Sequence, residues 1–340
     1  MNKIELGRTG LKVHQLGFGG IPIQRVEEDQ AVEVVRHAVK CGVDFIDTSR
    51  VYTTSENRIG KALQKTDKKV ILATKSFQRT ADGILGDIDV SLKELQTDYI
   101  DIYQCHAVMN ETDYANVIAP DGALAGLRKA QEKGLIGHIG LTSHSLDLLE
   151  KVVDDGFFDT IMVCFSFMEP AARERVIPAA KEKNIGVIAM KPFSGGVIEK
   201  PEIALKWVLA QPEVLILGGV EQTDLFDQNW QTFADCQPLT PKDREIIAEI
   251  RKTYDKAFCR RCDYCQPCSE EIPIQFVLGA QSIIKRSGGQ AAKGPLISWA
   301  MAKAKECTAC GECMTRCPYD LPIPDLIKEK SDWFEQNFAS

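Results

Sequence analysis

Eight short apolar runs recur at nearly regular intervals along most of the chain. They occupy residues 16–21, 43–48, 70–74, 99–105, 136–141, 160–165, 185–190 and 214–220, and their starts are 24 to 37 residues apart. Most of the runs are almost continuously apolar, which is typical of parallel strands that are covered by helices. The spacing predicts eight buried β-strands, each with room for a helix after it.

The segments between these runs have the periodicity of amphipathic helices. The segment 29–41 places its apolar residues on one face, and Gly42 follows it as a helix stop. Eight strand–helix units favour an α/β fold, a (β/α)8 TIM barrel, over an open doubly wound sheet. No G-x-G-x-x-G sequence opens a helix after the first run, which weakens the doubly wound alternative further.

The two ends of the chain differ from this repeating part. Residues 4–13 resemble a hairpin with a glycine in its turn, which we expect to precede the barrel and close its lower end. After Asn229 the repeat stops, and a further helix is expected to run to about Lys256, just before a cysteine-rich region. We predict a barrel domain over 1–255 and a C-terminal domain over 256–340.

Composition and charge exclude several classes of protein. The formal net charge is −7 without a dominant basic block, which argues against nucleic acid as a partner. No stretch reaches the roughly 18–20 apolar residues of a membrane span, so we expect none. The first residues show no apolar signal region. We therefore expect a soluble, cytoplasmic protein.

Polar residues close three consecutive strands of the predicted barrel. Asp47 lies at the end of the second strand and Tyr52 just after it, Lys75 ends the third and His106 ends the fourth. In TIM barrels the carboxyl ends of the strands meet at one rim, where catalytic residues lie. A lone aspartate there is usually a helix cap and a lone histidine usually structural, but all four together predict an active site.

The four side chains are suited to reducing a carbonyl group. A phenol has a pKa near about 10 and is a poor acid at neutral pH unless a neighbour lowers that value. The Lys75 ammonium would favour the phenolate form of Tyr52, and Asp47 would hold the lysine charged. His106 would donate to the carbonyl oxygen and polarise it.

Residues 3–235 resemble the aldo-keto reductases. The resemblance is carried by the segments 6–13, 47–52 and 55–60. It implies that Tyr52 is the proton donor, that Lys75 and Asp47 tune it, and that His106 orients the substrate, a small-molecule carbonyl compound. It also implies a nicotinamide cofactor, NADP(H) or NAD(H), bound across the barrel mouth.

The resemblance also assigns a set of cofactor-binding residues. They are Thr142, Ser143, Lys191, Pro192, Phe193, Gly195, Gly219, Val220, Gln222, Gln228 and Asn229. The set departs from the family pattern, because Met162 replaces a glutamine and Met190 replaces a stacking aromatic residue. For Lys191 two alternatives stay open: it binds the pyrophosphate of the cofactor, or it pairs with a loop carboxylate. For Glu221 the alternatives are that its carboxylate repels a 2′-phosphate or that its side chain turns to solvent.

Eight of the twelve cysteines form two compact groups near the C-terminus. They are Cys259, Cys262, Cys265 and Cys268 in the first group, and Cys307, Cys310, Cys313 and Cys317 in the second. The second group matches the bacterial ferredoxin pattern, in which the fourth cysteine binds the other of two clusters. The flanking sequences of Cys268 and Cys317 repeat each other, as expected for two related halves.

This pattern predicts a mostly helical, ferredoxin-like domain that binds two [4Fe-4S] clusters. We assign Cys259, Cys262, Cys265 and Cys317 to one cluster and the other four cysteines to the second. A pair of zinc sites and a single cluster with spare thiols are the alternatives. A subset of aldo-keto reductases carries such an extension, so the resemblance reaches the whole chain.

The most direct interpretation is an NAD(P)H-dependent oxidoreductase that reduces an aldehyde or ketone. The clusters would be structural braces or would serve an electron-transfer partner. Two other classes stay open: an iron-sulfur electron-transfer protein whose barrel mainly holds the clusters, and a partner-binding module on the same scaffold. The intact set of Asp47, Tyr52, Lys75 and His106 argues against both.

Overall fold

The computed structural model describes residues 3–287 and 289–338, with the side chain of Arg286 left aside. By their contacts these residues form two compact units: residues up to 194 together with 198–239, and residues 195–197 together with 240 onwards. Helix α10 (Pro241–Tyr254) groups with the second unit, whereas the sequence placed it in the barrel domain. The division at 255 stays a prediction.

The first unit is a closed parallel barrel of eight strands. Their order around the barrel is β10-β3-β4-β5-β6-β7-β8-β9, so each strand pairs with its neighbours in the chain and the last pairs with the first. The strands are β3 (Leu16–Gly19), β4 (Phe45–Asp47), β5 (Ile71–Ser76), β6 (Ile100–Cys105), β7 (Ile136–Ser143), β8 (Thr160–Cys164), β9 (Gly186–Met190) and β10 (Val214–Gly218). The predicted (β/α)8 barrel is confirmed, and the open sheet is not formed.

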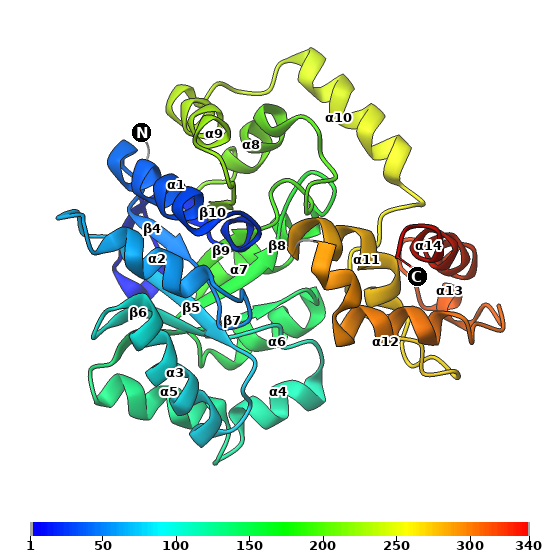
Figure 1. Ribbon diagram of the computed structural model, residues 1–340, viewed down its shortest axis with the longest axis horizontal. Helices are drawn as coiled ribbons and strands as arrows, with labels where there is room; N and C mark the ends of the chain where they lie inside the picture. Colours follow the sequence, from blue (N-terminus) through cyan, green and yellow to red (C-terminus); the bar gives the residue numbers. More distant parts are fainter. Residues whose placement is uncertain (1–2, 288, 339–340) are drawn as a thin grey trace. The chain divides into compact units, whose positions relative to one another are not determined.

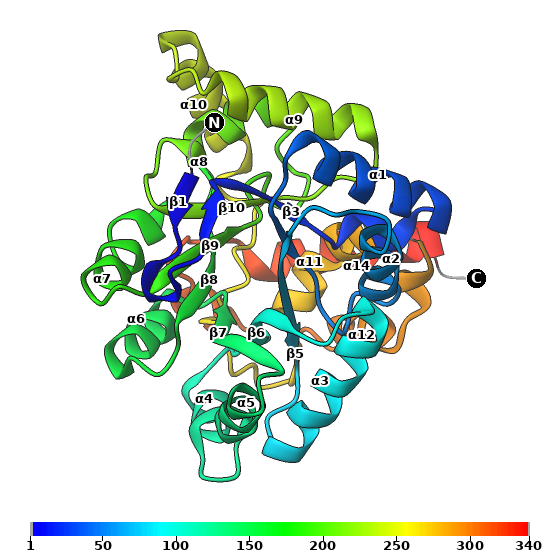
Figure 2. The same ribbon diagram turned by 90° about the vertical axis from the view of Figure 1, so that its left-hand side faces the viewer.

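Helices surround the strands, as Figures 1 and 2 show. They are α1 (Glu28–Cys41), α2 (Ser55–Leu63), α3 (Ala81–Leu95), α4 (Glu111–Ile118), α5 (Ala123–Glu132), α6 (Leu146–Asp155), α7 (Val176–Glu182), α8 (Pro201–Leu209) and α9 (Thr223–Asp235). Gly42 ends α1 in the left-handed conformation, with φ of 118°, and Gly156 ends α6 in the same way. The helix stop expected at Gly42 therefore has a conformational basis.

A hairpin closes the amino-terminal end of the barrel. Strands β1 (Lys3–Glu5) and β2 (Lys12–His14) pair antiparallel, and Gly10 in their connection has φ of 67°. Ile4, Leu6 and Val13 belong to the apolar cluster that fills the barrel interior, together with residues from β4, β5, β6, β8, β9 and β10. The expected cap is confirmed, and it lies at the opposite end of the barrel from the carboxyl ends of the strands.

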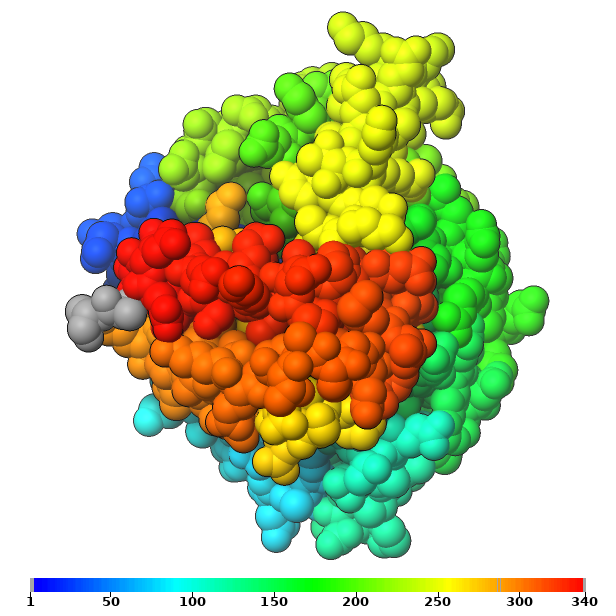
Figure 3. All heavy atoms as spheres, turned by 90° about the vertical axis from the view of Figure 1, so that its right-hand side faces the viewer, coloured from blue at the N-terminus to red at the C-terminus, as the bar shows by residue number. Residues whose placement is uncertain are grey.

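The second unit is mostly helical and has its own apolar core. Besides α10 it contains α11 (Ile274–Ser287), α12 (Pro295–Ala304), α13 (Glu312–Thr315) and α14 (Ile323–Phe338). Val277, Ala280, Ala300 and Leu326 are among its buried residues. Figure 3 shows α14 in red alongside α12 in orange, and the two helices pack together. The mostly helical character predicted for this part of the chain is confirmed.

The two sequence repeats in this unit have the same backbone structure. The amide of Glu271 donates to the carbonyl of Cys268 at 3.0 Å, and that of Asp320 donates to Cys317 at 3.2 Å. Glu271 and Asp320 both have a positive φ, 55° and 48°, which is uncommon for residues other than glycine. Each repeat then opens a long helix, α11 or α14, three residues later. The unit is therefore built from two related halves.

Candidate functional sites

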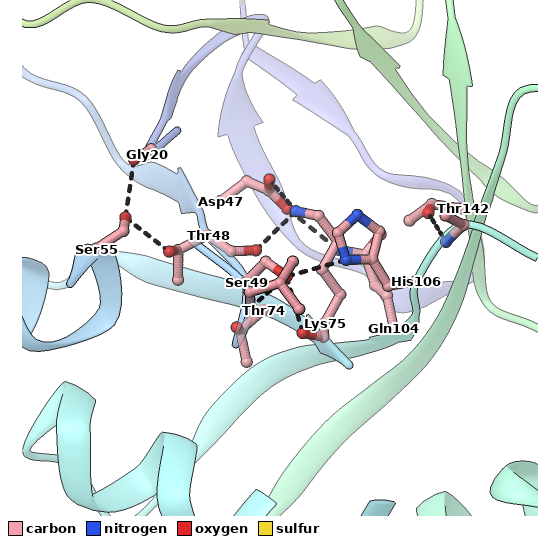
Figure 4. A network of polar contacts seen from close by, with 12 residues as sticks. Gly20, Asp47, Thr48, Ser49, Ser55, Thr74, Lys75, Gln104, His106 and Thr142 are labelled. Carbon is pink, nitrogen blue, oxygen red and sulfur yellow. Dashed lines mark hydrogen bonds and ion pairs between the residues drawn. The ribbon is translucent and has the colours of Figure 1, made fainter. Parts of the chain in front are cut away.

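A buried ion pair lies at the carboxyl ends of two neighbouring barrel strands. Lys75 of β5 and Asp47 of β4 are 1% and 3% exposed, and Lys75 Nζ lies 2.5 Å from Asp47 Oδ1. The ammonium also donates to the carbonyl oxygen of Thr48 at 2.6 Å. Figure 4 shows the two side chains turned toward each other inside the barrel. The parallel register of β4 and β5 brings these strand ends together.

Tyr52 lies in the turn between β4 and α2. Its amide donates to the carbonyl oxygen of Ser49 at 3.0 Å, and its own carbonyl accepts from the amide of Ser55 at 2.7 Å. Lys75 Nζ is 5.0 Å from the centre of the Tyr52 ring. The turn therefore brings the phenol against the buried ammonium.

Opposing effects set the pKa of Lys75. Burial lowers it, but the Asp47 carboxylate and the Tyr52 phenol outweigh burial and raise it above the ordinary lysine value. The lysine is therefore a fixed cation at neutral pH. A fixed cation next to a phenol favours the phenolate over the phenol.

His106 follows β6 and faces the same group. Its ring packs edge-on to Tyr52 at 5.9 Å between centres and stacks on Phe77 at 4.4 Å. Burial holds the pKa of His106 well below its ordinary value, and the charges of Lys75, Arg79 and Lys191 lower it further. At neutral pH the imidazole is therefore uncharged, with one N–H to donate. The structure thus brings together all four residues that the sequence placed at the barrel rim.

Two members of this network were missed in the sequence. Ser49 Oγ lies 3.0 Å from His106 Nδ1, and the Gln104 side-chain amide donates to Asp47 Oδ2 at 3.1 Å. Gln104 is fully buried and lies beside Lys75 in the register of β5 and β6. A signal was available for Gln104, since it is an uncharged polar residue inside an apolar strand. Ser49 gave none, because a serine after a strand is usually a turn residue.

The eight C-terminal cysteines approach one another in two mixed sets. One cavity of the second unit is lined by Cys268 together with Cys307, Cys310 and Cys313. In the other set, burial together with the nearby Cys259 and Cys317 raises the pKa of the Cys262 thiol to about 11, and Cys259 and Cys262 in turn contribute to the raised pKa of Cys265. Each set therefore contains three cysteines of one group and the last cysteine of the other.

Comparison with known proteins places the barrel in a family. The model of the aldo/keto reductase family matches residues 15–202, more than half of the chain. The chain belongs to the aldo/keto reductase family. It is therefore an oxidoreductase.

Individual members of the aldo/keto reductase family show the extent of the similarity. L-galactose dehydrogenase of Arabidopsis thaliana is 36% identical over 239 residues, which cover 63% of this chain and 73% of that protein. The uncharacterized oxidoreductase YqkF of Bacillus subtilis is 28% identical over 216 residues, covering 59% and 68%. The holo form of aldo-keto reductase AKR11C1 from Bacillus halodurans shares the fold, with a TM-score of 0.64, 24% identity and coverage of 74% and 96%.

Most of the predicted cofactor-binding residues lie on this same rim of the reductase barrel. Thr142 and Ser143 end β7, Lys191, Pro192 and Phe193 follow β9, and Gly219 and Val220 follow β10. Gln222 precedes α9, while Gln228 and Asn229 lie within that helix, Asn229 buried. Gly195 groups with the second unit. Met162, which replaces the expected glutamine, packs in the apolar cluster inside the barrel.

Lys191 and Glu221, whose roles the sequence left open, each contact a neighbouring polar side chain. Lys191 Nζ lies 2.7 Å from His144 Nε2 and 3.6 Å from Cys164 Sγ. Arg25 Nη2 lies 2.6 Å from Glu221 Oε2, and each side chain is 22% exposed. The carboxylate of Glu221 is therefore offset by a guanidinium rather than turned alone to solvent. This pair removes much of the repulsion that a 2′-phosphate would meet there.

No helix in the described part of the chain is long and apolar enough to cross a membrane.

Proposed function

We propose that this protein is an NAD(P)H-dependent reductase of an aldehyde or ketone in which Tyr52 supplies the proton. The observation that carries the proposal is the contact of the buried Lys75–Asp47 pair with the Tyr52 ring. A phenol beside a fixed ammonium is a stronger acid than a phenol in water. General acid catalysis at neutral pH requires such a shift.

Each neighbour of Tyr52 has a distinct part in this proposal. Lys75 stabilises the phenolate that remains once the proton has moved to the substrate oxygen. Asp47 keeps the lysine charged in a buried place, where an ammonium alone would lose its proton. The neutral His106 carries a single N–H; with that hydrogen on Nε2, the ring donates toward the substrate carbonyl oxygen and holds it near the phenol, while Nδ1 accepts from the Ser49 hydroxyl.

The residues at the barrel rim fit a nicotinamide cofactor. Thr142 Oγ1 accepts from the amide of Ala107 at 2.7 Å, so its hydroxyl hydrogen can still donate to a carboxamide. A Cβ at Gly219 would come within 2.9 Å of the Gly19 carbonyl oxygen. The close approach of these two backbone segments after β10 therefore requires a glycine at this position. When bound, the nicotinamide supplies a hydride to the carbonyl carbon. Because Arg25 offsets the charge of Glu221, this ion pair does not by itself select NADH over NADPH.

We also propose that the second unit binds two [4Fe-4S] clusters, with the crossed cysteine sets described above. Cys268 lines a cavity with Cys307, Cys310 and Cys313, which supports one set. For the other set, Arg316, next to Cys317, donates to the carbonyl oxygen of Cys265 at 3.2 Å. The matched backbones of the two halves support two equivalent sites. Such clusters provide one-electron transfer or bracing, and they fit a reducing, cytoplasmic setting.

The spacing of the sulfur atoms favours clusters over zinc. Four thiolates on one zinc ion at about 2.3 Å place their sulfurs roughly 3.8 Å apart. Among the described residues, which include all eight C-terminal cysteines, no three of these cysteines have sulfurs within 4.8 Å of one another. A cube-shaped cluster binds each thiolate on a different iron, so its four sulfurs lie farther apart than those around one zinc ion.

The reductase proposal is tested by an anaerobic assay with aldehydes and ketones and with NADH or NADPH. Tyr52→Phe should abolish reduction while the iron content stays unchanged. Tyr99→Phe is the matched control, because Tyr99 is 42% exposed and lies outside the site. Activity that survives in Tyr52→Phe would remove Tyr52 as proton donor.

Iron and sulfide analysis with an anaerobic visible spectrum tests the clusters. About eight iron atoms per chain are expected for two clusters, about four would mean one, and zinc without iron would refute the cluster proposal. Addition of NADH or NADPH then separates the two cluster roles. Bleaching would favour a redox relay with an electron-transfer partner, and unchanged absorbance would favour bracing.

A further inference from the structure

A cysteine, a histidine and an aspartate meet between two outer helices of the barrel, away from the carboxyl ends of the strands. His37 and Cys41 lie one turn apart in α1, and Asp227 lies in α9. Helices α1 and α9 pack side by side (Figures 1 and 2). Residues four apart on a helix share one face, so both α1 side chains point to α9. The proposed reductase chemistry uses none of the three.

The three ligand atoms are already close. His37 Nε2 lies 2.6 Å from Asp227 Oδ1 and 3.6 Å from Cys41 Sγ. One atom from each side chain lies within 4.8 Å of the other two, and among the described residues these three form the one group of this kind. The His37 ring is held by an edge-on contact with Phe226 at 5.8 Å between centres.

The separation of the histidine nitrogen and the cysteine sulfur matches that around a tetrahedral zinc ion. Bonds of about 2.0 Å to nitrogen and 2.3 Å to sulfur give a nitrogen–sulfur separation of about 3.5 Å. The observed separation between His37 Nε2 and Cys41 Sγ is 3.6 Å. To bind the metal at about 2.0 Å, Asp227 Oδ1 would have to move away from His37 Nε2 by up to about 0.7 Å. That side chain is 56% exposed and can move.

We propose that His37, Cys41 and Asp227 form a binding site for a borderline-soft divalent cation, with Zn²⁺ as the best match. Thiolate, imidazole and carboxylate are the three ligand types that zinc takes in proteins. The site is partly open, since His37 is 31% exposed, so water can fill the fourth position. The metal would join α1 to α9, which are far apart in the sequence but adjacent in the barrel.

Protection of Cys41 against alkylation tests this site. Protein with intact clusters is treated anaerobically with N-ethylmaleimide, with and without one equivalent of Zn²⁺, and each cysteine peptide is quantified. A metal-bound thiolate reacts poorly, so Zn²⁺ should slow alkylation of Cys41 by about tenfold or more. The exposed Cys236 at the end of α9 is an internal control whose rate should not change.

Two variants make the test specific. His37→Asn and Asp227→Asn remove one ligand each from the surface and should return Cys41 to its metal-free rate in the presence of Zn²⁺. Cys41→Ser should bind one zinc fewer per chain in equilibrium dialysis. Equal alkylation of Cys41 with and without Zn²⁺, or protection that persists in both Asn variants, would overturn the proposal. Because the alkylation of the Cys41 peptide is quantified by itself, zinc that binds to the C-terminal cysteines does not affect this measurement.

Discussion

The Lys75 ammonium lies 2.5 Å from the Asp47 carboxylate in the interior of the barrel, and both side chains are almost fully buried. Removing one partner of a buried ion pair leaves an uncompensated charge, which costs about 3–5 kcal/mol. We therefore expect Asp47→Asn to lower the free energy of unfolding by about this amount. Without the carboxylate the pKa of Lys75 also falls, so kcat/KM should drop by about a hundredfold or more.

Urea unfolding and steady-state kinetics measure the two effects separately. Asp98→Asn is the matched control, because it removes the same charge from an exposed position. An Asp47→Asn variant with wild-type stability and activity would contradict the ion pair as described.

Ser49 is expected to position His106. Its hydroxyl lies 3.0 Å from Nδ1 and 3.1 Å from the carbonyl oxygen of Lys75. Loss of one such hydrogen bond is worth about 1 kcal/mol, so Ser49→Ala should lower kcat/KM for the carbonyl substrate by about fivefold to tenfold. The dissociation constant of the nicotinamide, measured by fluorescence quenching, should stay unchanged. A variant that weakens cofactor binding and leaves carbonyl turnover intact would show that Ser49 acts elsewhere.

The barrel could be predicted from the sequence because its signal is repeated eight times. The four catalytic candidates could be predicted because the topology brings the carboxyl ends of adjacent parallel strands to one rim. Ser49, Gln104 and the Arg25–Glu221 pair could not, since each depends on side-chain directions that no spacing encodes. Arg25 and Glu221 are 196 residues apart and meet only because β10 pairs with β3 to close the barrel.

The trio of His37, Cys41 and Asp227 was missed for the same reason. His37 and Cys41 could have been noticed as a pair at helical spacing, but Asp227 lies almost 200 residues later. The crossed sets of cysteines could be predicted because a known spacing pattern states which cysteine binds the other cluster.

His106 should make the fold less stable in mild acid. Burial and neighbouring cations hold the pKa of His106 well below its ordinary value in the folded protein. In the unfolded chain this pKa is about 6.5. Between those two values the unfolded state binds more protons, so stability is fully present above pH of about 6.5 and is lost as pH falls below it. At pH of about 5.5 the loss due to this residue is about 1 kcal/mol.

The comparison of wild type with His106→Gln isolates this effect. Both are unfolded in urea at pH 7.5 and at pH 5.5, with pH changes chosen to leave other carboxylates largely ionised. The wild type should lose about 1 kcal/mol more than the variant over this interval. Equal losses in the two proteins would mean that His106 takes up its proton in the folded state without difficulty.

The crossed cysteine sets predict which thiols become open to alkylation when one of the two clusters is lost. Cys317→Ser removes a ligand from the set that contains Cys259, Cys262 and Cys265, whereas Cys268→Ser removes one from the set that contains Cys307, Cys310 and Cys313. Each variant should lose about half of the iron. In Cys317→Ser the newly alkylated thiols should be those of the first group, although the substitution lies in the second. Cys236→Ser, at an exposed cysteine outside both sets, should keep all of the iron. If each substitution instead releases the thiols of its own sequence group, the clusters are not crossed and each group binds its cluster alone.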